Sequence, residues 1–422
     1  MLHMMTSDAQ HGSPGERAGN DESGPLAGIR VVDLSSVVMG PYATQLMADL
    51  GADVVTIEPA AGDTNRRMST GPHRDLSGVS LNLLRNKRNV AIDLRSEAGR
   101  EVAGRLIGRA DVFLTNLRPG ALERLRLAYE DVKAINPTVV YCSAQGFPSD
   151  GERADDPAYD DVIQADSGLI DTMRRATGTA AMVPSLVADK VSGLSLAFAV
   201  AAALVHRART GEGRWVQVAM SEAVRSFVLV EHGAGAVPDA PRGAAGYERI
   251  LTPARRPQAT ADGWICIFPY HRSHYERLAE ETTTTGEKAT WAPGGNRDPS
   301  AMYELLGSIT PMRTTADWLA VCRQAGIPAA RVNSLDDLID ELPIAVHPKA
   351  GPYRVTPMPA RIEGVEAGRP RPAPTIGEHN RAVLVELGYA DTDIQQLEDA
   401  SVLWTRPGGG SGGSTSGGGG GR

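Results

Sequence analysis

The sequence predicts an α/β fold in which a large, open, doubly wound parallel sheet is joined to a smaller α+β domain. Short runs rich in β-branched residues alternate with helical patterns through the first half of the chain, which is typical of a parallel sheet covered on both faces. After a segment rich in glycine, proline and arginine (233–260), a second unit begins with a turn into a strand at Asp262–Ile265.

The first ordered run, Ile29–Leu34, is predicted to be a strand. Gly40 and Pro41 then lead into a helix over Tyr42–Leu50 that Gly51 ends, since proline suits a helix start and glycine a helix end. The later strands are expected at Asp53–Glu58, Val90–Leu94, Val112–Leu114, Val139–Cys142 and Trp215–Val218. The later helices are expected at Ser96–Arg109 with Ser96 as N-cap, at Leu122–Asn136, at Val191–Arg209 and from Ser221.

Changes in composition along the chain predict the domain boundaries. We expect a disordered polar arm at 1–25, a large domain at 26–225, a linker at 226–260, a small domain at 261–332, a C-terminal segment at 333–404 that returns to the large domain, and a flexible Gly/Ser tail at 405–422.

Composition excludes several classes of protein. Of the 422 residues, 41% are apolar and 22% are charged, as in a globular protein, and a net charge of −8 argues against nucleic-acid binding. Three scattered cysteines indicate reduced thiols and therefore a cytoplasmic protein. The longest apolar stretch, Leu194–Val205, is too short for a bilayer, and the N-terminus lacks an apolar signal core, so we expect no membrane association.

The sequence lacks the usual marks of a metal or nucleotide cofactor. His271 and His274 have no cysteine or acidic partner that would complete a metal site, so no metal is expected. Before the Gly/Ser tail neither GxGxxG nor GxxxxGK[ST] occurs, although Glu58 lies where a dehydrogenase places its ribose-binding acid. A dehydrogenase is therefore the weakest alternative.

Asp189 is the most informative single residue. It follows an apolar stretch and precedes a long apolar helix, which places its carboxylate at or just before a helix N-terminus. One interpretation is a helix N-cap. The other is a carboxylate nucleophile that the positive end of the helix dipole keeps ionised.

Eight segments, in one order along residues 26–403, resemble the class III CoA-transferases, the family of formyl-CoA transferase, carnitine CoA-transferases and α-methylacyl-CoA racemase. They are LAGIRVVDLSSVVMGPYATQLMADLGADVVTIEPAAGD, NKRNVAIDL, NLRPGALERL, PAYDDVIQADSGL, LVADKVSGL, RTGEGRWVQVAMSEA, GIPAARVNSLDDL and IGEHNRAVLVELGY. The resemblance implies an intertwined homodimer that uses acyl-CoA and carboxylic acids as substrates and holds no tightly bound cofactor.

The resemblance also implies the site residues. Asp189 is matched to the nucleophile that carries CoA through a mixed anhydride and an aspartyl-CoA thioester. The residues matched to CoA-binding positions lie in loops after successive strands: Val38 and Met39 beside the pantetheine, Ile92, Asp93, Leu94 and Arg95 near the nucleotide, Asn116, Leu117, Arg118 and Arg124 near the adenine and phosphates, and Gln145, Gly146 and Phe147 in the next loop.

Two alternatives to a transferase stay open within the same family resemblance. A racemase or epimerase needs two bases on opposite faces of the α-carbon, but Tyr159 stands where the racemases have a histidine, and a phenol is a poor base at neutral pH. Asp160 and Asp161 are expected to be structural or capping residues. A non-catalytic CoA-binding protein with this fold is the other alternative.

Overall fold

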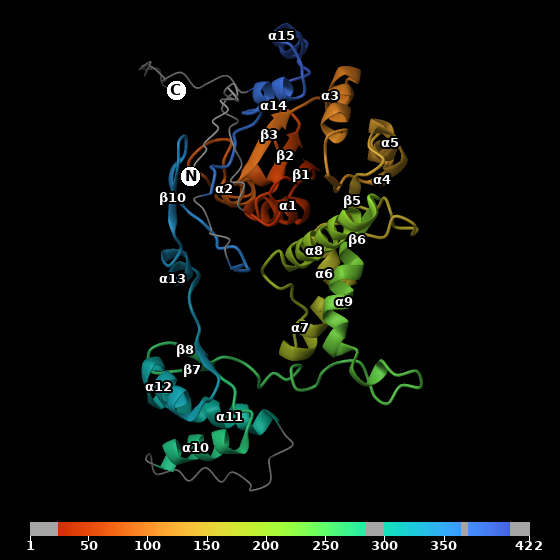
Figure 1. Cartoon of the computed structure of the whole chain (residues 1–422). Coiled ribbons are helices and arrows are strands. Elements are labelled where there is room, and N and C mark those ends of the chain that lie inside the picture. The colour runs from red at the N-terminus through yellow and green to blue at the C-terminus, as the bar shows by residue number, and fades with distance from the viewer. Residues whose placement is uncertain (1–23, 284–298, 364–369, 406–422) are drawn as a thin grey trace, which may run out of the picture.

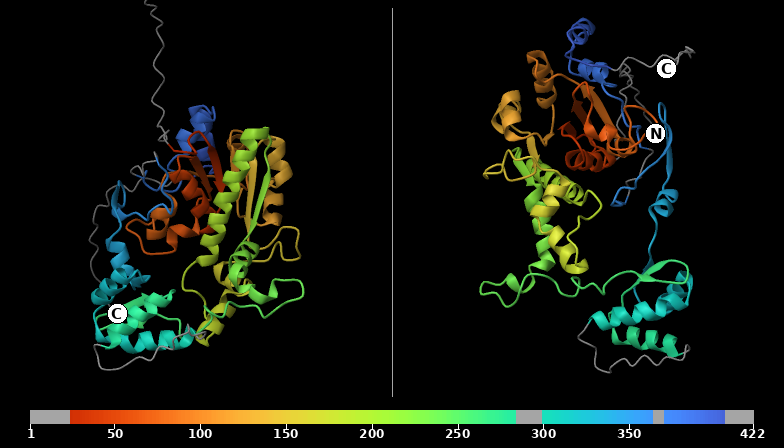
Figure 2. Two further views of the ribbon diagram at one scale, coloured as in Figure 1. Left: turned by 60° about the horizontal axis from the view of Figure 1, so that its bottom comes forward. Right: turned by 180° about the vertical axis from the view of Figure 1, so that it is seen from behind.

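The computed structural model describes residues 24–283, 299–363 and 370–405, so the predicted arm at 1–25 and tail at 405–422 lie almost entirely outside it. Figure 1 shows a large α/β part and a small part that stand apart. Two extended connections join them, one after helix α9 and one around helix α13, and Figure 2 shows the same separation from behind.

The large part is built on a six-stranded sheet in the order β3-β2-β1-β4-β5-β6, with every neighbouring pair parallel. The chain winds outward from β1 to β3, crosses to β4, and winds outward again to β6. The loops of β1 and β4 therefore leave in opposite directions, and open α/β sheets bind ligands at such a point. The predicted α/β class is confirmed. The strands are β1 (Arg30–Leu34), β2 (Asp53–Glu58), β3 (Lys87–Ala91), β4 (Val112–Thr115), β5 (Val140–Gln145) and β6 (Trp215–Ala219).

Helices cover both faces of the sheet because successive strand residues point to opposite sides. Val31 packs with the helices of one face, and its neighbour Val32 packs with those of the other. The first face carries α1 (Met39–Asp49), α6 (Asp160–Asp166), α8 (Val187–Thr210) and α9 (Met220–His232). The second carries α3 (Glu97–Ile107), α4 (Pro119–Leu125), α5 (Tyr129–Ile135), α14 (Asn380–Glu386) and α15 (Asp391–Asp399).

Several predicted boundaries differ from the structure for local reasons. Ser96 caps α3 as predicted, because its Oγ accepts the Gly99 N–H at 3.0 Å. The single helix predicted over 122–136 is two helices, since Arg126 ends α4 in the left-handed conformation with φ of 56°. Strand β3 lies earlier than predicted because Ile92 forms a bridge with Leu403 instead of extending the sheet.

The helices around the predicted linker also differ from expectation. Helix α8 begins at Val187 with Leu186 as its N-cap, so Asp189 lies inside the first turn and is not the cap. Helix α9 continues to His232, so residues 226–232, which we predicted as linker, are helical. Two further short helices in the large part are α2 (Gly78–Leu83) and α7 (Leu169–Thr177). The chain also forms the 3-10 turns η1 (Thr64–Arg67), η2 (Ala234–Ala236) and, between α11 and α12, η3 (Thr310–Met312).

The small part has its own core. Ile265, Leu306 and Trp318 are almost fully buried there, and the Trp318 indole N–H donates to the Thr310 carbonyl at 2.9 Å. Its antiparallel strands are β7 (Gln258–Ala259), β8 (Trp264–Ile267) and β9 (Ala329–Arg331), and its helices are α10 (Arg272–Thr283), α11 (Pro299–Ile309) and α12 (Thr315–Ala325).

The chain then returns to the large sheet through α13 (Leu335–Asp340) and the hairpin of β10 (Ile344–His347) and β11 (Gly351–Arg354). The segment before α14 docks along the β3 edge, where the His379 N–H donates to the Asn89 carbonyl at 3.0 Å. The Asn380 side chain accepts the Ala91 N–H at 2.9 Å. The C-terminal segment therefore occupies the hydrogen-bonding edge that β3 would otherwise leave open.

Helix α8 is long and apolar enough to cross a membrane by length and composition, contrary to our expectation for this stretch. It packs instead along α1 and α9 and beside β5 and β6 in the large part. The three cysteines are unpaired in the structure. The compartment of the protein stays a prediction.

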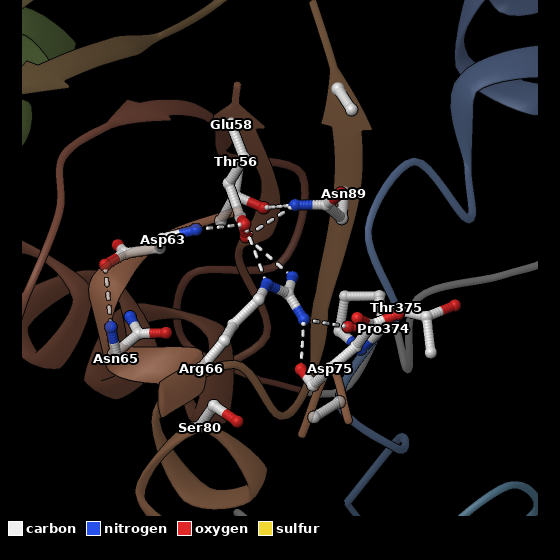
Figure 3. A network of polar contacts seen from close by, with 12 residues as sticks. Thr56, Glu58, Asp63, Asn65, Arg66, Asp75, Ser80, Asn89, Pro374 and Thr375 are labelled. Atoms are coloured by element: carbon white, nitrogen blue, oxygen red, sulfur yellow. Dashed lines mark hydrogen bonds and ion pairs between the residues drawn. The ribbon is translucent and has the colours of Figure 1, made fainter. Parts of the chain in front are cut away.

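A buried ion pair joins the end of β2 to distant parts of the chain (Figure 3). The Arg66 Nε and Nη2 atoms donate to the two Glu58 oxygens at 2.7 and 2.6 Å, and both side chains are almost completely buried. The Asn89 amide adds a third bond to Glu58 at 2.8 Å. Arg66 Nη1 also donates to the carbonyls of Asp75 and Pro374. With its oxygens occupied in this way, Glu58 cannot bind a ribose, which removes the feature that favoured a dehydrogenase.

We predict that Arg66→Ala lowers the free energy of unfolding by about 3–5 kcal/mol, because it leaves the Glu58 carboxylate buried without its partner. The double variant Glu58→Gln with Arg66→Met should be less destabilised, since it buries no lone charge. Arg95→Ala, which removes an exposed guanidinium, is the control and should leave stability unchanged. Urea unfolding measures all three, and a loss below about 1 kcal/mol for Arg66→Ala would contradict the argument.

Candidate active site

The residues matched to CoA-binding positions lie at the carboxyl ends of the strands β1, β3, β4 and β5 or in the segments that follow them, so the parallel sheet brings them to one edge. Their burial divides them into three groups. Arg95, Arg118 and Arg124 are exposed; Asp93, Leu94, Asn116, Leu117 and Gly146 are half-buried; and Val38, Met39, Ile92, Gln145 and Phe147 are buried.

The exposed group consists of three guanidinium groups. Arg95 makes an ion pair at 2.8 Å with the neighbouring Asp93. Arg118 is the N-cap residue of α4 and Arg124 lies in its last turn, and neither has an ion-pair partner among the described residues. An exposed arginine side chain suits phosphate oxygens, because its planar guanidinium can bind them with two N–H donors at once.

The buried group lies mostly in the core of the large part. Val38 and Met39 begin helix α1 and pack into the core, so the part of the loop that a ligand can reach is Ser35–Val37. Ile92 is covered by its bridge to Leu403. These residues resemble contact positions in sequence, but core packing removes their side chains from the surface.

Asn116 and Gln145 act on neighbouring loops. The Asn116 side chain accepts the Ser36 N–H at 3.0 Å and donates to the Ser36 carbonyl at 2.8 Å, which joins the loops of β1 and β4 where the chain reverses direction. The Gln145 amide nitrogen donates to the Leu117 carbonyl at 3.4 Å, while its oxygen is buried without a partner. Both side chains therefore hold the loops together.

Asp189 lies in the first turn of α8, at the positive end of the helix dipole. The residue is 8% exposed, and its carboxylate has no hydrogen-bond or ion-pair partner among the described residues. The adjacent Lys190 turns away and donates to the Ser185 hydroxyl at 2.8 Å. A carboxylate that is buried but unpaired is free to react with an incoming electrophile.

Asp160 fixes the start of this helix. One of its oxygens accepts the backbone N–H of Asp189 at 3.0 Å, and the other accepts from the Gln164 amide at 2.6 Å. Gln164 also bonds the Val183 N–H at 2.8 Å and so holds the segment that leads into α8. The sequence predicts a structural or capping role for Asp160 but does not single out Gln164. The spacing of four residues between them along α6 becomes informative only once the contact is known.

The environment of Asp189 favours its neutral form. The pKa of Asp189 is raised to about 7, chiefly by burial; the nearby Asp160 and Asp161 carboxylates add to the shift, and Lys190 opposes it. The group therefore exchanges its proton near neutral pH while remaining close to a helix N-terminus that favours its ionised form.

The loop between β5 and α6 carries Asp160 to its place. Phe147 is buried under the Arg153 guanidinium, which lies 3.6 Å from the ring centroid, and Arg153 makes an ion pair with Asp166 of α6 at 2.5 Å. A side chain on Gly146 would clash with Ala158, since its Cβ would lie 2.2 Å from the Ala158 Cβ. A glycine at 146 therefore lets the two ends of this loop approach.

Tyr159 precedes Asp160 as the N-cap residue of α6, and its side chain is exposed. No group of three or more His, Cys, Asp or Glu side chains that could hold a metal ion occurs within residues 24–283, 299–363 and 370–405.

Comparison with known proteins places this geometry in a family. A family model described as CoA-transferase family III matches residues 26–380. The chain is 30% identical to the "probable fatty acyl-CoA transferase" Rv3272 of Mycobacterium tuberculosis, over 85% of this chain and 97% of that one. It is 28% identical to the succinate–glutarate CoA-transferase of Agrobacterium fabrum, over 86% and 96%. A crystal structure of a CAIB/BAIF family protein from Brucella suis superposes with a TM-score of 0.74 at 27% identity, over 86% and 100%.

The raised pKa of Asp189 predicts how stability depends on pH. Between its ordinary value of 3.8 and about 7, the folded protein holds a proton that the unfolded chain has lost, so this residue's contribution to stability falls as pH rises through that window. Asp189→Asn removes the effect. Its stability relative to wild type should therefore increase from pH 4 to pH 7, by up to about 4 kcal/mol, and stay constant above.

Urea unfolding across this pH range measures the difference. Asp150→Asn, which changes an exposed carboxylate in the loop after β5, is the control and should show no such trend. A constant difference between Asp189→Asn and wild type at all pH values would contradict the shifted pKa.

Proposed function

The chain belongs to CoA-transferase family III and is an enzyme of that class, and from this premise we propose that Asp189 carries CoA from an acyl-CoA donor to a carboxylic acid acceptor through covalent intermediates. The observation that carries the proposal is the unpaired, buried carboxylate of Asp189 in the first turn of α8.

In the proposed first half-reaction the Asp189 carboxylate attacks the thioester carbonyl of the donor. The C–S bond breaks, giving a mixed anhydride on Asp189 and the CoA thiolate. The thiolate then attacks the Asp189 carbonyl, which gives an aspartyl-CoA thioester and releases the donor acid as its carboxylate. Because one activated acyl bond replaces another at each step, no external energy source is needed.

The second half-reaction runs the same steps in reverse with the acceptor. Its carboxylate attacks the aspartyl thioester and expels the CoA thiolate, which then attacks the acceptor's carbonyl in the new anhydride. Acyl-CoA leaves and the Asp189 carboxylate is restored. In this scheme Asp160 is a positioning residue, because it holds the Asp189 N–H and its charge raises the pKa of Asp189.

We further propose that the exposed Arg95, Arg118 and Arg124 bind the phosphates of CoA at the carboxyl edge of the sheet. The donor and acceptor acids are a separate matter. Relatives carry names that specify succinate with glutarate, succinyl-CoA with mesaconate, and formyl-CoA with oxalate. Succinyl-CoA is therefore the first donor to test.

Incubation of the enzyme with succinyl-CoA and other acyl-CoA donors should give a covalent adduct on wild type that intact-protein mass spectrometry detects and hydroxylamine removes. Asp189→Ala should give no adduct and no transfer. Asp150→Asn, which changes an exposed carboxylate in the loop after β5, should react like wild type. Adduct formation should rise with pH toward a plateau above about 7, since only ionised Asp189 attacks.

Two outcomes would decide for the alternatives. Absence of any adduct, together with solvent deuterium entering the α-carbon of an acyl-CoA without an acceptor acid, would indicate a racemase. Binding of CoA that is unchanged in Asp189→Ala, with neither adduct nor exchange, would indicate a non-catalytic CoA-binding protein.

We also propose that the enzyme is an intertwined homodimer. Helices α8 and α9 present an apolar face without cover in the single chain, with Phe198 77% and Val230 82% exposed. Leu335, Ile344 and Val346 are similarly exposed on the connection that crosses back from the small part (Figure 1). Exposed apolar patches of this kind mark protein–protein contacts. In a homodimer each of the two patches can be covered by apolar surface of the second copy.

Light scattering after gel filtration should give about twice the chain mass of 44.7 kDa for wild type. Phe198→Glu should shift the protein toward monomer, because it places a charge in the proposed interface. Val385→Glu, at an exposed apolar residue of α14 outside both surfaces, should remain dimeric. A wild-type monomer at micromolar concentration would sink the proposal.

A further inference from the structure

The reachable loop Ser35–Val37 adopts an unfavourable backbone conformation at its last residue. Val37 has a φ of 69°, in the left-handed region that glycine tolerates and a β-branched residue strongly disfavours. Such a conformation persists only where the surroundings hold it in place, and it is concentrated at functional sites. The question is which residues hold Val37.

Two side chains from one turn hold both polar groups of the Val37 residue. The Val37 N–H donates to Asp63 Oδ1 at 3.0 Å, and the Val37 carbonyl accepts from the Asn65 amide at 3.3 Å. The Asp63 carboxylate also accepts the Asn65 N–H at 2.9 Å and so caps the 3-10 turn η1. Loop and turn are thereby fixed to each other through a single carboxylate.

Asp63 is itself held by the ion pair described above. Its N–H donates to Glu58 Oε2 at 2.8 Å, and Glu58 is fixed by Arg66 (Figure 3). A continuous series of contacts therefore leads from Arg66 through Glu58 and Asp63 to Val37. The Val37 backbone is positioned by the same network that closes this edge of the sheet.

We propose that Asp63 is a positioning residue of the active site, which holds Val37 in its left-handed conformation so that Ser35–Val37 presents a fixed surface to the acyl-CoA. The proposal rests on the proposed function for the identity of the ligand. Its structural part, that Asp63 controls the order of the loop, does not.

The hold depends on pH. Burial raises the pKa of Asp63 to about 6, the N–H bonds of Asn65 and Val37 oppose the shift, and the charges of Glu58 and Asp33 add to it. Two other charged groups are close: Arg66, which forms the ion pair with Glu58, and the buried Lys87, which faces Asp33. Below pH 6 the neutral carboxyl accepts the Val37 N–H more weakly than the carboxylate does.

Hydrogen exchange of the full-length protein tests the structural part. In Asp63→Ala, peptides over residues 34–42 should exchange about tenfold faster than in wild type. In Asp63→Asn, which keeps one acceptor oxygen, the increase should be smaller. Asp393→Asn is the matched control, because Asp393 accepts the Ala390 N–H to cap α15, an element with no hydrogen bond or ion pair to the loop among the described residues. If Asp63→Ala changed exchange only over residues 64–67, Asp63 would be a helix cap alone and the proposal would be overturned.

The pH dependence of the affinity for coenzyme A is a second test, because a residue that only capped the turn would not change it. The affinity for coenzyme A is measured by calorimetry at pH 7.5 and pH 5.2, in an Asp189→Asn background that removes the titration of Asp189. Asp63→Asn should bind coenzyme A about fivefold more weakly than its parent at pH 7.5 and equally well at pH 5.2, where the parent is also neutral at this position. Because the two proteins are compared at the same pH, the titration of the coenzyme A phosphates cancels in the ratio of their affinities.

A ratio that stays the same at both pH values would overturn the pH-dependent role. Neither measurement requires turnover, so the two proposals fail separately. A protein that shows the expected exchange and affinity changes but no adduct on Asp189 would refute the proposed transfer mechanism and leave the role of Asp63 standing. A protein that does not bind coenzyme A at all would count against the proposed function, and exchange would still decide whether Asp63 holds the loop.

Discussion

The buried pair of Glu58 and Arg66 is the interaction on which the carboxyl edge of the sheet depends. Desolvating two charges is costly, and the cost is offset here because the oxygens and nitrogens of the pair have additional hydrogen-bond partners. Those partners come from β3, from the turn after β2 and from the segment that returns after the small part. The pair therefore joins regions of the chain that meet only when the whole fold is complete.

This edge replaces the glycine-rich loop that phosphate-binding α/β proteins place after the first strand. In those proteins glycine tolerates the unusual backbone, and amide N–H groups face the phosphates. Here the loop has a valine in the left-handed conformation, and the backbone of Ser36 and Val37 is bonded to side chains of Asn116, Asp63 and Asn65. Loop order thus comes from buried polar contacts, and we propose that exposed arginines bind the phosphates.

Opposing effects meet at Asp189. The first turn of a long helix favours a carboxylate, whereas burial and the Asp160 charge favour the neutral acid. The resulting pKa near 7 gives a group that is substantially ionised at neutral pH and yet forms no ion pair within the part of the chain that the structure describes. Asp160 has two effects on Asp189: it accepts the Asp189 N–H, which fixes the start of the helix, and its charge repels the Asp189 carboxylate.

The sequence by itself determined the parallel α/β architecture, the Ser96 cap, the place of Asp189 close to the start of a long helix, and the loops that meet at one edge of the sheet. These features depend on periodicity and on residues close together in the chain. Only the tertiary structure decided that Glu58 pairs with Arg66 and reaches Asn89, that Asp160 bonds Asp189, and that Val38, Met39, Ile92 and Phe147 are covered by packing. Those outcomes depend on contacts between segments tens to hundreds of residues apart, and a local pattern carries no information about which distant side chain completes a buried polar group.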